Sequence, residues 1–247
     1  MHQPSRKVAA NALEVTGTMA TTKERNDSDK VLVEQLARSI SAAMPTLDVT
    51  DQQIAIATYR LLAAGKPVAI EAIAGAVGVP PARVEAAFGS WPGVYRDDSG
   101  RVAGFWGLAI SPLDPEYSLQ IDGKTSYAWC ALDTLFIPPL MGKTVSVRAT
   151  DPVNGEPVSL VVDRNGVREL TPSGAVVSMV VPDGPFDYDV IDSFCHKVLF
   201  FTSEKSGRSW VAQHEGTTLL TVQEAFEVGR FAPDFVYPDV FGQPKKA

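Results

Sequence analysis

Hydrophobic positions recur at helical spacing through the first third of the chain. Between residues 30 and 44, apolar side chains return every three or four positions, which predicts a helix that Pro45 closes. A second helix is predicted to begin at a capping box formed by Thr50 and Gln53 and to end at Gly65. The first third of the chain is therefore predicted to be helical.

Two shorter helices and a hairpin are predicted to follow. Residues 70–77 read as a helix stopped by Gly78, and Pro80-Pro81 suits the first turn of the next helix. Two strand-like runs then flank the turn residues 97–100. Three helices followed by a hairpin is the order typical of a winged helix-turn-helix.

The periodicity changes at about residue 106, where strands and turns take over. A Thr221/Glu224 capping box predicts a late helix. The fold class is therefore α+β, with an N-terminal winged-helix-like helical domain followed by a mixed β-sheet domain with flanking helices. The predicted divisions are residues 1–40 (an extension, partly disordered and then helical), 41–105 and 106–247. The predicted strands are 117–121, 144–148, 157–162, 175–181 and 198–201.

Composition fits a folded protein. Of 247 residues, 45% are hydrophobic and 21% are charged, which excludes disorder of the whole chain. No apolar run reaches the ~18 residues of a membrane span. The first thirty residues contain no apolar signal-peptide core, so we expect a cytoplasmic protein that does not bind membranes. Residues 1–28 are predicted to be a mobile lead-in.

Charge argues against nucleic-acid binding by the winged-helix-like region. Residues 51–105 contain five basic and five acidic side chains, whereas a surface that neutralises phosphates is clearly basic. The net charge of −7 arises entirely from residues 106–247, which hold 11 basic and 18 acidic side chains. We therefore expect this region to pack against the rest of the chain and to bind no nucleic acid.

Only two cysteines are present, Cys130 and Cys195. A disulfide framework is not expected in a reducing compartment. The three histidines do not fall at zinc-finger spacing, so a cysteine-rich zinc site is excluded too. Two readings stay open at this point: inert core thiols, or two thiols that meet in the fold to do chemistry.

An acidic residue lies close to the first cysteine in sequence. Residues 126–135 are predicted to form a helix that starts at Ser126 and ends before Pro138-Pro139, which places Cys130 and Asp133 on one face. A carboxylate is costly on an apolar helix. Asp133 is expected either to cap a loop or pair with an arginine, or to act beside the thiol.

The segment from Tyr127 to Leu135, with the sequence YAWCALDTL, resembles the signature of the organomercurial (alkylmercury) lyase family. The runs 155–160, 193–195 and 200–201 follow in the family's order, and the resemblance covers about residues 45–230. Many members of the family carry a further cysteine at the position of Asp151, and some carry one at the position of His196. The lead-in is longer than is usual for the family, and Met19 is an alternative start.

The resemblance implies that R–Hg⁺ is cleaved to the hydrocarbon R–H and Hg²⁺ in mercury detoxification, without an organic cofactor. It implies that Cys130 and Cys195 bind mercury and that Asp133, beside the metal, handles the proton. Soft thiolates are the protein ligands that a soft cation prefers, which agrees with this assignment. The expected partners are an organomercurial substrate and, as acceptor of Hg²⁺, small thiols or a mercuric reductase.

Two other classes of function remain as alternatives. A metal-responsive winged-helix regulator would use the same cysteines as a sensor, and a thiol–disulfide switch would cycle them between redox states. Trp129, Tyr127 and Phe194 are expected either to wall an apolar substrate pocket or to pack in the core. His196 is expected either to tune Cys195 or to lie at the surface.

Overall fold

The computed structural model describes residues 22–241, so most of the predicted lead-in, including Met19, lies outside the described residues. The helices are α1 (Thr22–Ala43), α2 (Val49–Leu62), α3 (Ile70–Val77), α4 (Pro81–Ser90), α5 (Asp133–Met141), α6 (Val190–Ser193), α7 (Glu204–Val211), α8 (Val222–Gly229) and α9 (Pro238–Phe241). The strands are β1 (Val94–Arg96), β2 (Val102–Phe105), β3 (Leu108–Ala109), β4 (Tyr117–Ile121), β5 (Lys124–Ala128), β6 (Val145–Thr150), β7 (Pro157–Asp163), β8 (Gly166–Thr171), β9 (Val176–Val180), β10 (Phe200–Phe201) and β11 (Thr217–Thr221).

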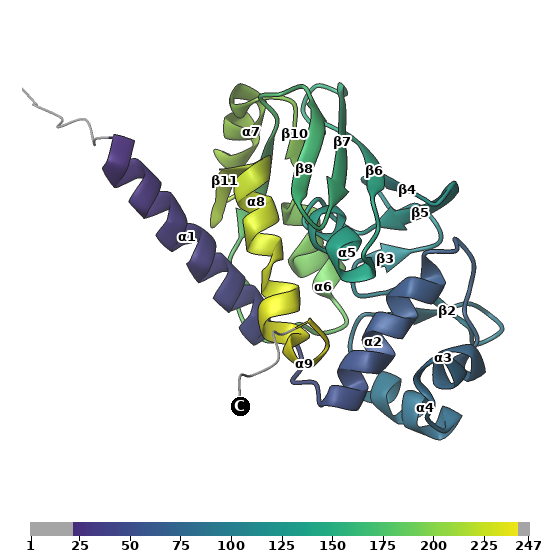
Figure 1. The fold of residues 1–247 in the computed structure, drawn as a ribbon. Helices are drawn as coiled ribbons and strands as arrows, with labels where there is room; N and C mark the ends of the chain where they lie inside the picture. Colours follow the sequence, from purple (N-terminus) through teal and green to yellow (C-terminus); the bar gives the residue numbers. More distant parts are fainter. Residues whose placement is uncertain (1–21, 242–247) are drawn as a thin grey trace, which may run out of the picture.

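Helices α2, α3 and α4 and the β1–β2 hairpin form the predicted winged-helix arrangement at one end of the molecule (Figure 1). Helix α3 has the predicted bounds, and Gly78 ends it in the left-handed conformation at φ 81°. Helix α1 begins at Thr22, so the helix replaces the last part of the predicted lead-in. It runs beside α8 (Figure 1), against which it packs.

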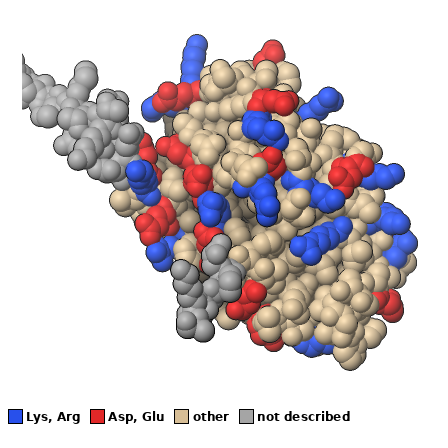
Figure 2. All heavy atoms as spheres, viewed as in Figure 1, with Lys and Arg blue, Asp and Glu red and all other residues tan. Residues whose placement is uncertain are grey.

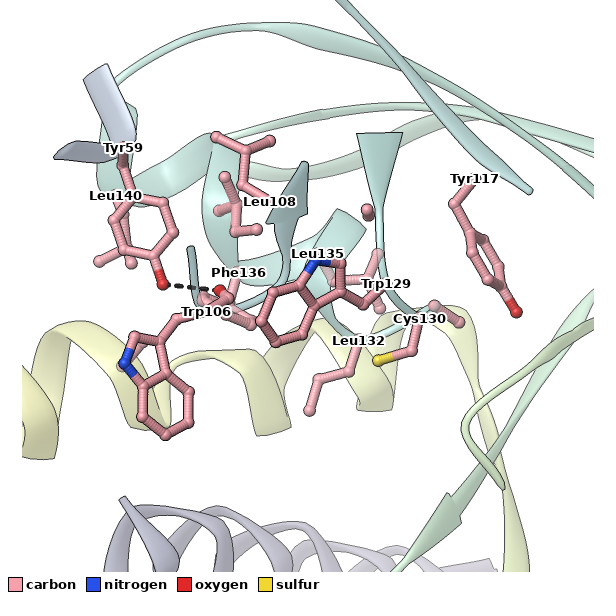
Figure 3. Packing of buried hydrophobic residues seen from close by; sticks show 14 of the residues in the cluster. Tyr59, Trp106, Leu108, Tyr117, Trp129, Cys130, Leu132, Leu135, Phe136 and Leu140 are labelled. Carbon is pink, nitrogen blue, oxygen red and sulfur yellow. Dashed lines mark hydrogen bonds between the residues drawn. The ribbon is translucent and has the colours of Figure 1, made fainter. Parts of the chain in front are cut away.

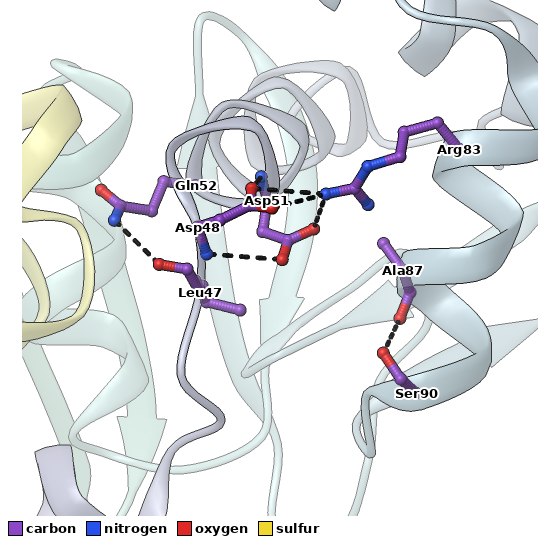
Figure 4. Close-up of polar contacts among 7 residues, drawn as sticks. All are labelled: Leu47, Asp48, Asp51, Gln52, Arg83, Ala87 and Ser90. Carbon is purple, nitrogen blue, oxygen red and sulfur yellow. Dashed lines mark hydrogen bonds and ion pairs between the residues drawn. The ribbon is translucent and has the colours of Figure 1, made fainter.

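The cap of α2 differs from the prediction. Asp48, rather than Thr50, is the N-cap, and its carboxylate accepts a hydrogen bond from the Asp51 N–H at 2.8 Å. An ionised carboxylate at the helix N-terminus also interacts favourably with the helix dipole. Arg83 of α4 reaches the same two acids, at 2.7 Å from Asp51 and 3.1 Å from Asp48 (Figure 4). These ion pairs fix α4 against the start of α2.

A single eight-stranded sheet spans both parts of the chain, in the order β1-β2-β3-β5-β4-β6-β7-β8. The boundary predicted at residue 106 falls at the turn between β2 and β3, inside this sheet. All its pairings are antiparallel, and so are those of the second sheet, β10-β9-β11, so the predicted mixed sheet is wrong as to strand direction. Tight hairpins join β4 to β5 and β7 to β8, and such turns cannot make a parallel crossover. The α+β class is confirmed.

Residues 126–135 do not form the predicted helix. Lys124–Ala128 is strand β5, which pairs with β4 through the two-residue turn Asp122-Gly123, both at positive φ. This Asp-Gly hairpin signal outweighs the helical spacing of the apolar residues. Helix α5 begins only at Asp133, continues through Pro138 and Pro139, and ends at Gly142. Cys130 therefore lies in the connection between a strand and a helix.

The late helix α8 begins as predicted, with the reciprocal Thr221/Glu224 capping box. It lies between α1 and the sheets (Figure 1), where its buried face packs against α5 and β8. None of the helices in residues 22–241 combines the length and apolar character that a bilayer-spanning helix requires.

Candidate active site

The fold brings Cys130, Asp133 and Cys195 together. Their ligand atoms, the two Sγ atoms and a carboxylate oxygen, all lie within 4.8 Å of one another. All three side chains are buried, and Cys130 is fully excluded from solvent. The sequence prediction that Cys130 and Asp133 approach each other is confirmed, although the helix on which it rested is not formed.

Asp133 reaches the first cysteine from the start of α5. Its Oδ2 accepts a hydrogen bond from the Cys130 backbone N–H at 2.8 Å. The contact thus resembles an N-terminal cap in which a helix residue turns back on the connection preceding it. Thr134, the next residue, donates from its hydroxyl to the Ala131 carbonyl at 2.7 Å. These two bonds set the path of residues 130–134 and with it the position of the carboxyl group.

Cys195 opens the 3₁₀ turn η1 (Cys195–Lys197) that follows α6. The segment after this turn docks on the first cysteine's connection, because the Ala131 N–H donates to the Val198 carbonyl at 3.0 Å. Ser178 of β9 holds the same segment from the other side. Its hydroxyl donates to the Lys197 carbonyl at 2.8 Å and accepts from the Leu199 N–H at 3.0 Å. The segment that follows the second thiol is therefore held between β9 and the connection that carries Cys130.

A narrow cavity of about 30 Å³ leads to the reactive groups. Among residues 22–241, Asp133 is the only carboxyl and Cys195 the only thiol in its wall, whereas Cys130 does not line it. Such a cavity accommodates roughly one water molecule. The remaining lining residues are almost all apolar or aromatic: Ile40, Met44, Trp106, Gly107, Trp129, Leu132, Phe136, Phe186, Val190, Phe194 and Phe231.

Comparison with known proteins places this arrangement in a family. Residues 110–232 match the family model described as alkylmercury lyase, and residues 27–106 match the model of its helix-turn-helix domain. Curated alkylmercury lyases from Staphylococcus epidermidis and Bacillus cereus are each 40% identical over 171 residues, covering 69% of this chain and 77% and 76% of theirs. The chain belongs to the alkylmercury lyase family.

Solved structures agree with this alkylmercury lyase fold. A crystal structure of the mercury-bound form of MerB2 superposes with a TM-score of 0.64 and covers 83% of this chain and 98% of its own. The two sequences are 20% identical, so this similarity supports the fold alone. The alkylmercury lyase of Pseudomonas putida is 34% identical over 174 residues, or 70% of this chain and 80% of the relative.

Burial dominates the protonation equilibria in the candidate site of this alkylmercury lyase. It raises the pKa of Asp133 to about 7, an effect that hydrogen bonds from Cys130 and from the Trp129 backbone only partly offset. Burial, the hydrogen bond to Cys195 and the Asp133 charge raise the pKa of Cys130 well above its ordinary value. For Cys195 the hydrogen bond from Cys130 lowers the pKa, but burial and the Asp133 charge outweigh it, so the pKa is raised. At neutral pH the free enzyme therefore holds two thiols beside a half-ionised acid.

The aromatic neighbours of the cysteines divide into two groups. Trp129 and Phe194 line the cavity, so they are part of the pocket wall as well as of the core. Tyr127 is half-buried on β5 and does not line it. The His196 side chain is 43% exposed, and its Nδ1 lies 3.0 Å from Asp192 Oδ1. Both observations favour the expectation of a surface histidine over that of a histidine that tunes Cys195.

Asp151, where the resemblance leads us to expect a cysteine in many relatives, lies in a structural surrounding. It is fully buried, and it accepts hydrogen bonds from the Thr202 N–H and hydroxyl, both at 2.8 Å, and from the Val153 N–H. Burial opposes ionisation, yet these bonds outweigh it and lower the pKa of Asp151. The carboxylate thereby ties the β6–β7 turn to the residue that follows β10, away from the cavity.

Sequence reasoning missed two residues that shape the site. Ser178 is a lone hydroxyl in the otherwise apolar strand β9, and this interruption was the available signal. Gly107 has a φ of 92°, and a Cβ at this position would meet Asp133 Oδ1 at 2.2 Å. The Trp-Gly pair gives no comparable signal in the sequence, because the contact between Gly107 and Asp133 joins the β2–β3 turn to helix α5.

A wider surface hollow of about 320 Å³ lies between α2, α5 and α8 and is separate from the site. Three arginines border it, Arg60, Arg164 and Arg230, but none of the three reactive side chains does. Basic and acidic side chains are interspersed over the face of the molecule drawn in Figure 2. The smaller, buried cavity is therefore the better candidate for the chemistry, because it has a thiol and a carboxyl in its wall and the surface hollow has no thiol.

Proposed function

We propose that the protein cleaves the carbon–mercury bond of organomercurials R–Hg⁺, with Cys130 and Cys195 as the mercury ligands and Asp133 as the acid that protonates carbon. The observation that carries this proposal is the close approach of two buried thiols and one carboxyl, of which Cys195 and Asp133 line an apolar cavity. Family membership supports the same reaction. An organomercurial also suits the cavity chemically, because it joins a soft cation to an apolar group.

The order of binding follows from exposure. Cys195 lines the cavity and Cys130 does not, so mercury meets Cys195 first. The metal displaces the thiol proton, which is released to solvent, since thiolate is the form that binds metal. Cys130 then binds from behind, and its proton passes to the Asp133 carboxylate beside it. Two thiolates now donate to mercury and place negative charge on the attached carbon.

Protonation of that carbon completes the reaction. The Asp133 carboxylic acid gives its proton to the carbon, the carbon–mercury electron pair becomes the new carbon–hydrogen bond, and R–H leaves. Hg²⁺ remains on the two thiolates, and Asp133 returns to the carboxylate. A pKa of about 7 suits this role, because both protonation states are accessible at neutral pH. All steps use residues of this chain, without an organic cofactor.

Handover of the product belongs to the same proposal. Small thiols or a mercuric reductase are the proposed acceptors, because only another soft sulfur ligand competes with two thiolates. We also propose the cytoplasm, where such thiols stay reduced. The helix-turn-helix region matches the model of the lyase family's own domain, so the metal-responsive regulator and the thiol–disulfide switch gain no support.

The test is arene release. Purified protein is incubated with phenylmercury and excess small thiol, and benzene is measured by gas chromatography. We expect stoichiometric benzene and protein-bound or thiol-bound Hg²⁺. The Cys130→Ser, Cys195→Ser double variant is the matched control for spontaneous protonolysis. Phenylmercury that stays intact on the wild-type protein would contradict the proposed function.

A further inference from the structure

Helix α2 of the winged-helix region donates a hydrogen bond to the turn that lines the active-site cavity. Tyr59 of α2 is fully buried, and its hydroxyl donates to the Trp106 carbonyl at 2.8 Å. Figure 3 shows this hydroxyl directed at the carbonyl from the side opposite to Trp129 and Cys130. Trp106 belongs to the turn Trp106-Gly107 between β2 and β3, and both of its residues line the cavity.

This turn has an unfavourable backbone conformation. Trp106 has a φ of 36° and Gly107 one of 92°, and a positive φ is uncommon for a bulky residue such as tryptophan. Surrounding contacts must therefore hold the turn. Besides the bond from Tyr59, the Trp106 N–H donates to the Gly93 carbonyl at 2.9 Å, and the Gly107 carbonyl accepts from the Trp129 N–H at 3.0 Å.

The held turn forms a wall against the Asp133 carboxyl. A Cβ built on Gly107 would meet Oδ1 at 2.2 Å and the carboxyl carbon at 2.4 Å, so the glycine backbone itself is in contact with the acid. The other oxygen, Oδ2, accepts the Cys130 N–H. The carboxyl group is thus confined between a hydrogen bond on one side and a backbone surface on the other.

We propose that the Trp106-Gly107 turn sets the position of the Asp133 carboxyl, and that Tyr59 and Gly107 are positioning residues for proton delivery. The inference rests on the proposed function, because it assigns Asp133 the transferred proton. It gives the winged-helix region a role in the lyase reaction: α2 supplies the hydroxyl that stabilises the turn. Removing that hydroxyl leaves both thiols and the acid in place but frees the wall.

The first test replaces Tyr59 by Phe. Its control is Thr58→Val, which removes the hydroxyl of the neighbouring residue, where it bonds the Ile54 carbonyl at 2.7 Å within α2. Uptake of phenylmercury is followed by mass spectrometry of the protein adduct, and cleavage by benzene release. We expect Tyr59→Phe to take up phenylmercury with an unchanged KM and to lose about 10- to 100-fold in kcat. Thr58→Val is expected to cleave at the wild-type rate.

The second test replaces glycines by alanine. It tests the positioning role of the turn even if Tyr59→Phe does not fold. Gly107→Ala and Gly123→Ala both place alanine at a positive φ, 92° and 75°, so they share the backbone strain. Only the alanine at 107 meets Asp133, because nothing lies within 4 Å of a Cβ at 123. We expect cleavage to fall at least 10-fold more in Gly107→Ala than in Gly123→Ala, with adduct formation retained in both.

The outcomes separate the two proposals. A wild-type protein that releases no benzene overturns the proposed function, and the positioning role with it. Wild-type turnover together with an undiminished kcat in Tyr59→Phe, or in Gly107→Ala relative to Gly123→Ala, overturns the positioning role alone. A loss of uptake equal to the loss of cleavage also contradicts it, because that result would mean a damaged thiol site rather than a displaced acid.

Discussion

The two thiols differ in their access to the cavity, since Cys195 lines it and Cys130 lies behind. We therefore expect Cys195→Ser to take up phenylmercury more slowly than Cys130→Ser, and both to lose turnover because one soft ligand activates the carbon too weakly. Time-resolved mass spectrometry of the adduct and benzene release measure the two effects. Near-normal turnover by either variant would exclude a two-thiol mechanism, provided that circular dichroism shows an intact fold.

Asp133→Asn separates binding from proton transfer. The amide oxygen still accepts the Cys130 N–H, but the side chain has no acidic proton to deliver. We expect the variant to hold phenylmercury on its thiols and to release benzene about 10²- to 10⁴-fold more slowly, roughly 3 to 5 kcal/mol of barrier. Mass spectrometry will show the intact phenyl–mercury adduct. Wild-type benzene release would mean that another group supplies the proton.

The raised pKa of Asp133 also predicts how stability varies with pH. A carboxyl with a pKa of about 7 when folded and 3.8 when unfolded binds more protons in the folded state. Stability is therefore lost as pH rises from about 4 to 7. From pH 5 to pH 8 the wild type is expected to lose about 3 kcal/mol relative to Asp133→Asn. Urea unfolding of both proteins at the two pH values measures this difference, and an equal pH dependence would refute the assignment.

For single residues, the sequence identifies the candidate reactive groups better than the residues that hold them in place. The spacing of Cys130 and Asp133 predicts their contact because three positions separate them in any compact local path. Tyr59 and Trp106 are 47 positions apart, and no local pattern links a helix residue to a turn carbonyl. Ser178 and Gly107 likewise act on segments that are distant in sequence. Their roles depend on tertiary packing, which periodicity does not encode.

Among the elements, α1 contributes to the cavity wall as well as to the scaffold. Its residue Ile40 and the following Met44 line the cavity, and the Ala43 carbonyl accepts a hydrogen bond at 2.8 Å from Phe186, another lining residue. Because the cavity holds only about one water molecule, an organic group must displace part of this wall. We therefore expect the end of α1 and the segment at Phe186 to limit the size of the organic group.

Met44→Ala is expected to favour bulky substrates. Truncating a flexible thioether side chain widens the cavity without removing a hydrogen bond. We expect kcat/KM for phenylmercury to rise a few-fold relative to methylmercury, roughly 1 kcal/mol of discrimination. Val31→Ala, at an exposed position of the same helix, is the control and leaves the ratio unchanged. An unchanged ratio in Met44→Ala would mean that the organic group enters elsewhere.

Helices whose ends carry characteristic capping residues were predictable. Gly78 and the Thr221/Glu224 box mark ends of helices where the backbone itself requires these residue types. The helix predicted for residues 126–135 is wrong because a short apolar run fits both helical and strand patterns. The choice was made by pairing with β4 across Asp122-Gly123 and by the buried sheet environment. Strand direction followed from the lengths of the connections rather than from the strands themselves.

For the whole molecule, the charge pattern predicts weak DNA binding despite the winged-helix arrangement. Arg83, Arg96 and Arg101 are each ion-paired with an acid of the same region. Few basic groups are left to neutralise phosphates, so we expect no salt-dependent, sequence-selective affinity. Fluorescence anisotropy with labelled duplexes at low and at physiological salt measures this. Sub-micromolar binding to a defined duplex at physiological salt would revive the regulator hypothesis.

The two sulfurs that meet in the site are 65 positions apart in the chain. An ion held by both of them closes a loop of that length even after the chain unfolds, which in the chain-entropy model raises the free energy of the unfolded state by about 4 kcal/mol. A mercuric ion bound in the proposed way would act as a reversible cross-link. We therefore expect the protein with Hg²⁺ bound to resist heat and proteolysis better than the metal-free protein, until an external thiol removes the ion.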